Sequence, residues 1–150
     1  MIDRWNDWKR HLVDDDAGIT ELLAQTRRIA VIGIKPESHA NQPAHYVPAY
    51  LQREEFDVIP VPTYYPEVIE ILGRPVVRRL AEIDGGIDMV NLFRRPVDIA
   101  MHVDEILAAL PKSVWMQQGI RNDEAAECFA KAGIKVVQNR CLMVEHRDRA

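Results

Sequence analysis

A glycine, a lysine and a serine follow one apolar run in an order that suits the binding of an anion. Gly33 ends the run Ile29–Ile32, and Lys35 and Ser38 come shortly after it. Glycine lets a ligand approach the backbone closely, and free N–H groups in such a loop favour phosphate. A tight turn between a strand and a helix explains a single glycine equally well. On this loop alone the two interpretations are level.

Two consecutive arginines follow a second apolar run. Arg94 and Arg95 come after Ile87–Leu92 and Phe93, ahead of a segment with helical spacing. A guanidinium group can bind two oxygens of one phosphate, which makes arginine a common phosphate ligand. A solvated surface pair is the usual meaning of two adjacent arginines. Their position at the end of an expected strand favours phosphate binding.

Further polar residues lie at the end of the run Ser113–Gln117 and beyond it. Gln117 suits a hydrogen bond to a ligand, and Gly119 permits close backbone approach. Asn122 is of the type that caps the start of a helix. Trp115 shares a strand face with Gln117, so it either flanks the same crevice or fills the core, which is the commoner fate of tryptophan.

The run Asp57–Val61 lacks the acidic residue that an NAD site normally places near the end of its second strand. Pro62, Thr63 and two tyrosines follow it, and no acid comes before Glu67. That acid usually lies about 20 residues beyond the glycines and holds the ribose hydroxyls. The G-x-G-x-x-G pattern is also missing, so ordinary NAD chemistry is disfavoured. The prolines and tyrosines form either a wall for adenine or another flat group, or a rigid turn with exposed rings.

No arrangement typical of a catalytic centre stands out. None of the five histidines follows a strand-end nucleophile motif such as G-x-S-x-G, and no metal-ligand spacing is present. His39 and His45 lie near the expected phosphate loop, where exposed loop histidines are the plainer interpretation. Cys141 follows the last apolar run and is either a buried small hydrophobe or a thiol facing the crevice. A binding protein rather than an enzyme is therefore expected.

A parallel sheet would bring these loops together. Five short, nearly continuous runs rich in Val and Ile suit strands covered on both faces. These runs are Ile29–Ile34, Asp57–Val61, Ile87–Leu92, Ser113–Gln117 and Lys135–Gln138. Helical spacing predicts helices around Tyr46–Leu51, Arg78–Ile83, Val97–Leu110 and Ala125–Ala130. The alternation predicts a doubly wound α/β fold with helices on both faces and a five-stranded sheet of order 3-2-1-4-5. Ligands of such sheets bind beyond the carboxyl ends of the strands, where the order reverses.

The chain of 150 residues is expected to hold one such domain over residues 27–146. Residues 1–26 predict an N-terminal helical extension, with Trp5 and Trp8 supplying apolar contacts. The net charge of −4 disfavours nucleic acid and anionic membranes as partners, and no apolar run approaches the ~20 residues of a membrane span. The N-terminus is too polar and acidic for a signal peptide, and two cysteines are too few for a disulfide framework. A cytoplasmic protein is expected.

Taken together, the pattern resembles the stand-alone CoA-binding domain proteins, the small bacterial YccU-like family. This family shares its Rossmann-like fold with the nucleotide-binding domain of the succinyl-CoA synthetase alpha subunit. The matching stretches are "IAVIGIKP", "YLQREEFDVIPV", "LGRPVVRRLAEI", "DMVNLFRRP", "VWMQQGIRNDEAAE" and "AGIKVVQNRCLMVEH". They lie in order along most of the chain. The resemblance implies binding of coenzyme A or an acyl-CoA, with its ADP part across the crevice.

The motifs of the resemblance and the loop arguments together define one candidate site. Its cofactor-binding residues are Gly33, Ile34, Lys35, Pro36, Ser38, Pro62, Thr63, Phe93, Arg94, Arg95, Trp115, Gln117, Gly119 and Asn122. The last motif of the family matches Cys141. This chain departs from the family where Lys35 replaces a common Ser, where Pro62-Thr63 replaces Asn-Pro, and where Asn91 and Asn139 replace Asp.

The expected function is that of a non-catalytic sensor or carrier of CoA. Two alternatives remain beside it. One is a small acyl-transfer or redox enzyme that uses Cys141, whose thiol would meet that of CoA. The other is an interaction subunit that contacts its partner through the helix of Trp5 and Trp8. A homodimer or another protein partner is compatible with the sequence.

Overall fold

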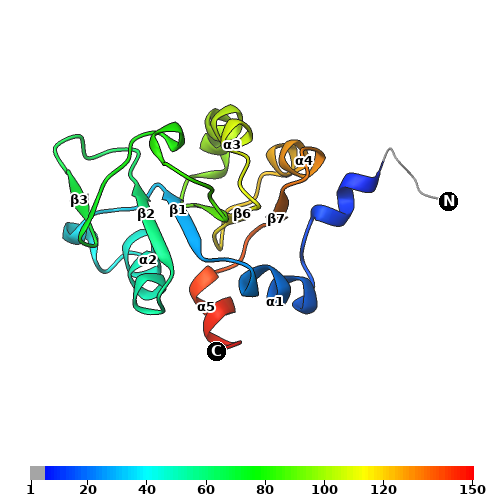
Figure 1. Ribbon diagram of the computed structural model, residues 1–150, viewed down its shortest axis with the longest axis horizontal. Helices are drawn as coiled ribbons and strands as arrows, with labels where there is room; N and C mark the ends of the chain where they lie inside the picture. The colour runs from blue at the N-terminus through cyan, green and yellow to red at the C-terminus, as the bar shows by residue number, and fades with distance from the viewer. Residues whose placement is uncertain (1–5) are drawn as a thin grey trace.

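The computed structural model describes residues 6–150 and shows a sheet covered by helices on both faces (Figure 1). The main sheet is five-stranded, has the order β2-β1-β5-β6-β7, and is parallel throughout. Its strands are β1 (Arg28–Ile32), β2 (Asp57–Val61), β5 (Met89–Leu92), β6 (Ser113–Met116) and β7 (Lys135–Val137). A separate antiparallel pair consists of β3 (Glu70–Ile71) and β4 (Arg74–Pro75). The predicted α/β fold with a five-stranded parallel sheet is confirmed.

The strand order reverses between β1 and β5. The chain leaves β1 for β2 on one side, forms the β3–β4 pair beyond β2, and then returns to place β5 on the other side of β1. The N–H of Val77, just after β4, donates to the carbonyl of Pro60 at 2.9 Å and so partly covers the β2 edge. The strand order is consistent with the predicted 3-2-1-4-5 arrangement when the β3–β4 hairpin beyond β2 is counted as element 3. Strand β5, which contains most of the expected run Ile87–Leu92, is then element 4 and lies beside β1.

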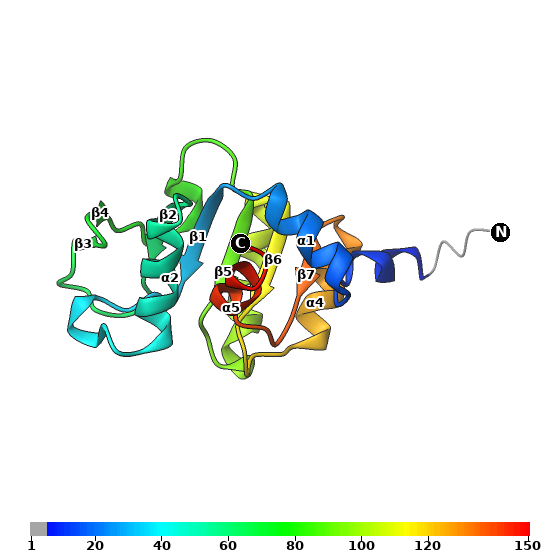
Figure 2. The same cartoon turned by 90° about the horizontal axis from the view of Figure 1, so that it is seen from below.

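The helices form two layers, one on each face of the sheet (Figures 1 and 2). On one face lie α1 (Asp16–Ala24), α2 (Pro43–Arg53) and α5 (Leu142–Arg147); on the other lie α3 (Val103–Ala109) and α4 (Asp123–Lys131). Short 3-10 turns connect them: η1 (Asp7–His11), η2 (Glu37–His39), η3 (Leu80–Glu82) and η4 (Pro96–His102). The helices expected around Tyr46–Leu51 and Ala125–Ala130 are confirmed, and the one expected at Arg78–Ile83 is the single turn η3.

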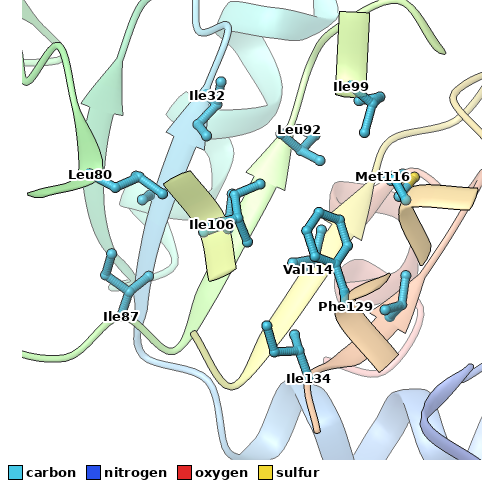
Figure 3. Close-up of a cluster of buried hydrophobic side chains, with 14 of the residues drawn as sticks. Ile32, Leu80, Ile87, Leu92, Ile99, Ile106, Val114, Met116, Phe129 and Ile134 are labelled. Atoms are coloured by element: carbon cyan, nitrogen blue, oxygen red, sulfur yellow. The ribbon is translucent and has the colours of Figure 1, made fainter. Parts of the chain in front are cut away.

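Alternate residues of each strand enter different cores, as the pleat of a strand requires. Ala30 and Ile32 of β1 belong to the cluster under α3 and α4, while Ile29 and Val31 belong to the cluster under α1, α2 and α5. Figure 3 shows the first cluster, in which Ile106 and Phe129 reach down from their helices onto the sheet. Because both faces are covered, the strands are apolar almost throughout, which is why the sequence shows runs rather than alternation.

Local signals explain where α4 begins and ends. The Asn122 side chain accepts a hydrogen bond from the N–H of Ala125, which caps the first turn. At the other end Gly133 has φ +87°, and the N–H of Ile134 returns to the carbonyl of Phe129 at 3.1 Å. This is a Schellman motif, which favours glycine at the left-handed position.

The N-terminal segment packs onto the same sheet. Ile19, Leu22 and Leu23 of α1 are buried in the cluster that holds Ile29 of β1. Trp8 of η1 packs against the opposite cluster, and its ring lies 5.7 Å from the ammonium of Lys131 in α4. Trp5 lies outside the described residues. Within residues 6–150, every helix is too short or too polar to cross a bilayer.

Candidate functional site

Three loops meet at the carboxyl edge where the strand order reverses. They follow β1, β2 and β5, the three strands that surround the reversal. In doubly wound sheets the two chain directions diverge here and leave a crevice, so backbone N–H groups and side chains from different loops can reach one ligand. The predicted residues from Gly33 to Ser38, from Pro62 to Thr63 and from Phe93 to Arg95 all belong to these loops.

Gly33 makes the closest approach between two of the loops. Its φ is +90°, and a Cβ placed on it would stand closer than 3.0 Å to the carbonyl oxygen of Phe93. Its N–H donates to Val61 at 2.9 Å, while the N–H of Phe93 donates to Ile32 at 2.9 Å. The turn therefore ties the end of β1 to the ends of β2 and β5, and both the backbone angle and the space require glycine.

The lysine loop is fixed to α2 through a proline inside that helix. Pro48 has no N–H, so the carbonyl of Ala44 one turn earlier loses its usual helical donor. The N–H of Lys35 donates to this carbonyl at 3.1 Å instead, and Nδ1 of His45 donates to the Lys35 carbonyl at 2.9 Å. The Lys35 ammonium binds the side chain of Gln42, the residue before α2. A cation and the positive end of an 11-residue helix are thus held together.

The flanking residues of this loop have different surroundings. Ile34 and Pro36 are buried and shape the loop, whereas Ser38 is exposed. The Ser38 hydroxyl lies 3.0 Å from Nδ1 of His39, whose Nε2 lies 3.5 Å from the hydroxyl of Tyr65. The β1 loop and the β2 loop therefore touch through His39 and Tyr65.

Arg94 crosses from the β5 loop to the β2 loop. Its Cδ lies 3.4 Å from the position of a Cβ on Gly33, and its Nη1 donates to the Thr63 hydroxyl at 3.2 Å. Its Nε donates to Nε2 of His102 at 3.1 Å. Arg95 turns away, with its Nε 2.8 Å from a carboxylate oxygen of Asp98, which raises the pKa of Arg95. Of the two predicted arginines, Arg94 is the one placed over the Gly33 turn.

The β2 loop is held by Arg78, an arginine that was not among the predicted site residues. Arg78 donates to the carbonyls of Tyr64, Tyr65 and Val68 at 2.8 to 2.9 Å. Tyr65 has φ +59°, an uncommon value for a residue with a side chain. Three carbonyls gathered on one guanidinium stabilise this bend, and with it the position of Thr63 near Arg94.

The predicted residues after β6 serve mainly the fold. Trp115 is fully buried under the α1, α2 and α5 layer, and its indole N–H donates to the Arg140 carbonyl at 2.8 Å. Gln117 is 4% exposed, and its Oε1 accepts from the N–H of Leu142 at 3.3 Å. Trp115 is corrected as a candidate binding residue: of the two places left open for it, the crevice and the core, the structure shows the core, because α5 and the turn before it cover that strand face. The tryptophan belongs to the core.

Gly119 and Asn122 shape the loop that follows. Gly119 has φ +85° and donates its N–H to Asn139 at 2.7 Å. Besides capping α4, Asn122 donates from Nδ2 to the Pro96 carbonyl at 3.1 Å, which joins this loop to η4. These two residues lie along the same sheet edge as Arg94, but the side chain of Asn122 is engaged by the backbone.

A cavity of about 440 Å³ lies further along the edge, at the ends of β6 and β7. Gln118, Arg121, Asn139 and Cys141 are among its lining residues. Cys141 is half-buried and is a free thiol. None of the predicted residues of the β1, β2 and β5 loops lines this cavity. The sheet edge therefore offers two regions, a cationic one at the reversal and a polar cavity beside it.

Several residues that build the cationic region were not assigned to it from the sequence, and His45, expected as an exposed loop histidine, is instead buried in α2. Gln42, His45, Arg78 and His102 hold Lys35, Thr63 and Arg94 in place. Pro48 was the one available signal, because a proline within an otherwise helical stretch frees a carbonyl for another donor.

A doubly wound parallel sheet with a glycine turn and cations at its reversal point defines a nucleotide-binding type of α/β domain. A family model described as "CoA binding domain" matches residues 27–147. The chain belongs to this family of CoA-binding domains.

Individual relatives agree in sequence and in fold. The uncharacterized protein YneT of Bacillus subtilis (strain 168) is 35% identical over 130 residues, which cover 87% of this chain and 93% of YneT. A Thermus thermophilus structure is 37% identical with a TM-score of 0.81, covering 90% of this chain and 98% of that one. A hypothetical protein of Pyrococcus horikoshii is 32% identical with a TM-score of 0.80, covering 90% and 92%. An acetyl-coenzyme A synthetase of Ca. Korarchaeum cryptofilum shares the fold at 13% identity, with a TM-score of 0.61, covering 77% of this chain and 27% of that one.

Proposed function

We propose that this protein binds coenzyme A or an acyl-CoA at the carboxyl edge of β1, β2 and β5 without transforming it. The observation that carries the proposal is the placement of Arg94 across the Gly33 turn, between the β5 and β2 loops. Membership in the CoA-binding domain family supports the choice of ligand. The ligand's pyrophosphate would lie beside the turn and meet the Lys35 ammonium and the Arg94 guanidinium, the cations that such an anion needs.

The flat part of the ligand would lie beside the β2 loop. Tyr64 is 71% exposed, and its ring packs edge-on against that of Tyr65 at 5.1 Å. Pro62 is buried and stiffens the start of the loop. Exposed aromatic rings next to a cationic turn suit adenine, which stacks through its face.

A binding role without catalysis is favoured by the way the reactive side chains are occupied. The Ser38 and His39 pair has a phenol, not a carboxylate, on the second imidazole nitrogen. A serine nucleophile needs a histidine that a third group orients as a base, and among the described contacts His39 has no such carboxylate. The pair therefore links two loops.

The test compares ligands and variants by calorimetry and thermal shift. CoA and acetyl-CoA are expected to bind and to raise the melting temperature, whereas NAD and ATP should do so less. A shift with NAD but none with any CoA species would overturn the proposal. Mass spectrometry of small molecules retained by the protein under native conditions identifies the acyl group, if one is carried.

Variants locate the site. Arg94→Ala and Lys35→Ala should each weaken CoA binding about 10- to 150-fold, the value of a hydrogen bond to a charged group of ~1.5–3 kcal/mol. Both should leave binding of phosphate-free pantetheine nearly unchanged. Arg95→Ala is the matched control, because its side chain is 78% exposed and turned to Asp98. Equal losses for CoA and pantetheine would mean that the residues support only the fold.

A second candidate function rests on the cavity at Cys141. A free thiol in a polar cavity beside the proposed CoA site suits a small acyl-transfer or redox enzyme. That function predicts turnover of a thioester that disappears in Cys141→Ala while CoA affinity and the melting temperature stay unchanged. Inertness of the wild-type protein toward thioesters and NAD(P)H would leave binding as the function.

A further inference from the structure

His102 lies behind Arg94 at the end of η4. It is buried, with 9% of its surface exposed, and its Nε2 stands 3.1 Å from the Nε of Arg94. An arginine Nε always carries a hydrogen, so Nε2 of His102 must be the acceptor in this contact. The imidazole is therefore neutral, and its own hydrogen is on Nδ1.

The opposite side of the ring faces a fixed carboxylate. Nδ1 of His102 lies 3.7 Å from one oxygen of Glu105, and the other oxygen accepts from the N–H of Leu80 at 2.7 Å. A carboxylate on the Nδ1 side favours the tautomer with its hydrogen there. A chain of polar contacts thus runs from η3 through α3 and η4 to Arg94.

The charges around the ring are unequal. Burial and the Arg94 cation lower the pKa of His102 below its ordinary 6.5. Glu105 and Asp98 oppose this effect without outweighing it. Near neutral pH the ring is accordingly an acceptor, and acid converts it into a second cation against Arg94.

We propose that His102 is the positioning residue for Arg94: its neutral ring holds the guanidinium over the Gly33 turn, and protonation of the ring releases it. This inference rests on the proposed function of the site, since Arg94 is the group that meets the ligand. The protein should accordingly lose affinity for CoA on acidification through a group that does not touch the ligand. The reach of Arg94 to Thr63, now 3.2 Å, would loosen at the same time.

The test measures the dissociation constant for CoA from about pH 5 to pH 8 in the wild-type protein, in His102→Gln and in His146→Gln. Glutamine can accept from Arg94 but does not titrate in this range. His146 is the matched control, because it bonds the Tyr50 hydroxyl at 2.8 Å in the α2 and α5 layer. The phosphates of CoA titrate identically in all three experiments, so the ratio between proteins isolates the histidine.

The wild-type dissociation constant should rise about tenfold relative to that of His102→Gln between neutral and acidic pH. His146→Gln should follow the wild type. Parallel profiles of the wild type and His102→Gln, or a wild-type affinity that increases relative to His102→Gln in acid, would overturn the role of His102 while leaving CoA binding intact. Absence of CoA binding at every pH would instead refute the proposed function.

An NMR titration of the wild-type protein gives a second readout that needs no variant. If binding requires the neutral ring, saturation with CoA must lower the pKa of His102, because coupling between ligand and proton is reciprocal. An unchanged or raised pKa on binding would contradict the inference even if His102→Gln fails to fold.

Discussion

Replacing Gly33 by alanine tests the central geometry of the site. Two costs add at this position: a left-handed backbone that disfavours any Cβ, and a Cβ that would collide with the Phe93 carbonyl. The first cost is about 1–2 kcal/mol, and forcing an extra methyl group into a packed place adds about 1–3 kcal/mol. The free energy of unfolding should therefore fall by about 2–5 kcal/mol, and the ends of β1 and β5 should separate.

Gly133 provides the control for the backbone term. Its φ of +87° is almost that of Gly33 at +90°, yet nothing lies within 4 Å of the position of its Cβ. Gly133→Ala should lose only the first cost, about 1–2 kcal/mol. Urea unfolding followed by circular dichroism measures both, and calorimetry with CoA should show a loss of affinity for Gly33→Ala alone. Equal free-energy losses in the two variants would refute the close approach of the β1 and β5 loops.

Three further perturbations have defined outcomes. Arg78→Ala should weaken CoA binding several-fold, because the β2 loop loses the guanidinium that binds three of its carbonyls. Arg79→Ala, which removes a side chain that is 79% exposed, should change the affinity little. Equal CoA affinities of the two variants would show that the β2 loop keeps its conformation without Arg78. Burial alone raises the pKa of Asp88, but two backbone N–H groups and a lysine outweigh it and lower the pKa below 3.8. The stability that this carboxylate contributes is complete above pH 3.8 and is lost as the pH falls through the lowered pKa. In Asp88→Asn the free energy of unfolding should therefore depend less steeply on pH below 3.8 than in the wild type. The same pH dependence in both proteins would contradict this role of Asp88. Asn91→Leu should leave the free energy of unfolding nearly unchanged, because removal of the buried, unpartnered Oδ1 offsets the loss of the hydrogen bond from Nδ2 to the Trp115 carbonyl at 3.3 Å. A loss above about 2 kcal/mol, measured by urea unfolding, would show that Oδ1 is satisfied as well.

The strands and their ends were predictable because burial on both faces leaves a direct trace in the sequence. Each expected run overlaps its strand, and Asp57–Val61 coincides with β2. The β3–β4 pair and α5 were not predicted as elements, since strands of two residues and a helix of six carry almost no periodic signal. The path of the chain beyond β2 could not be predicted, because it runs through the β3–β4 pair.

The residues of the candidate site likewise fall into those that leave a signal in the sequence and those that do not. Gly33 and Arg94 were expected at one edge of the sheet because their places at strand ends are informative, and the structure brings them together there; their contact with a ligand stays a prediction. Trp115 stayed open between crevice and core because alternation reveals which residues share a strand face, but not what covers that face, and here α5 and the preceding turn do. His102 was missed because its contact with Arg94 depends on the pitch of η4, which no spacing rule encodes.

The match to the family begins at residue 27, but residues before it already belong to the packed core. The apolar side of α1 is packed into the same interior as β1, and Asp14 and Asp16 form ion pairs with Arg140 and Arg149 near the chain's other end. A truncation at residue 27 would expose apolar residues on the sheet face that α1 covers. It would also leave Arg140 and Arg149 to share one carboxylate, that of Glu145. Expression trials and domain swaps should therefore keep α1 with the sheet, and they should keep η1 and the segment after it as well, because Trp8 and Val13 pack against the two core clusters.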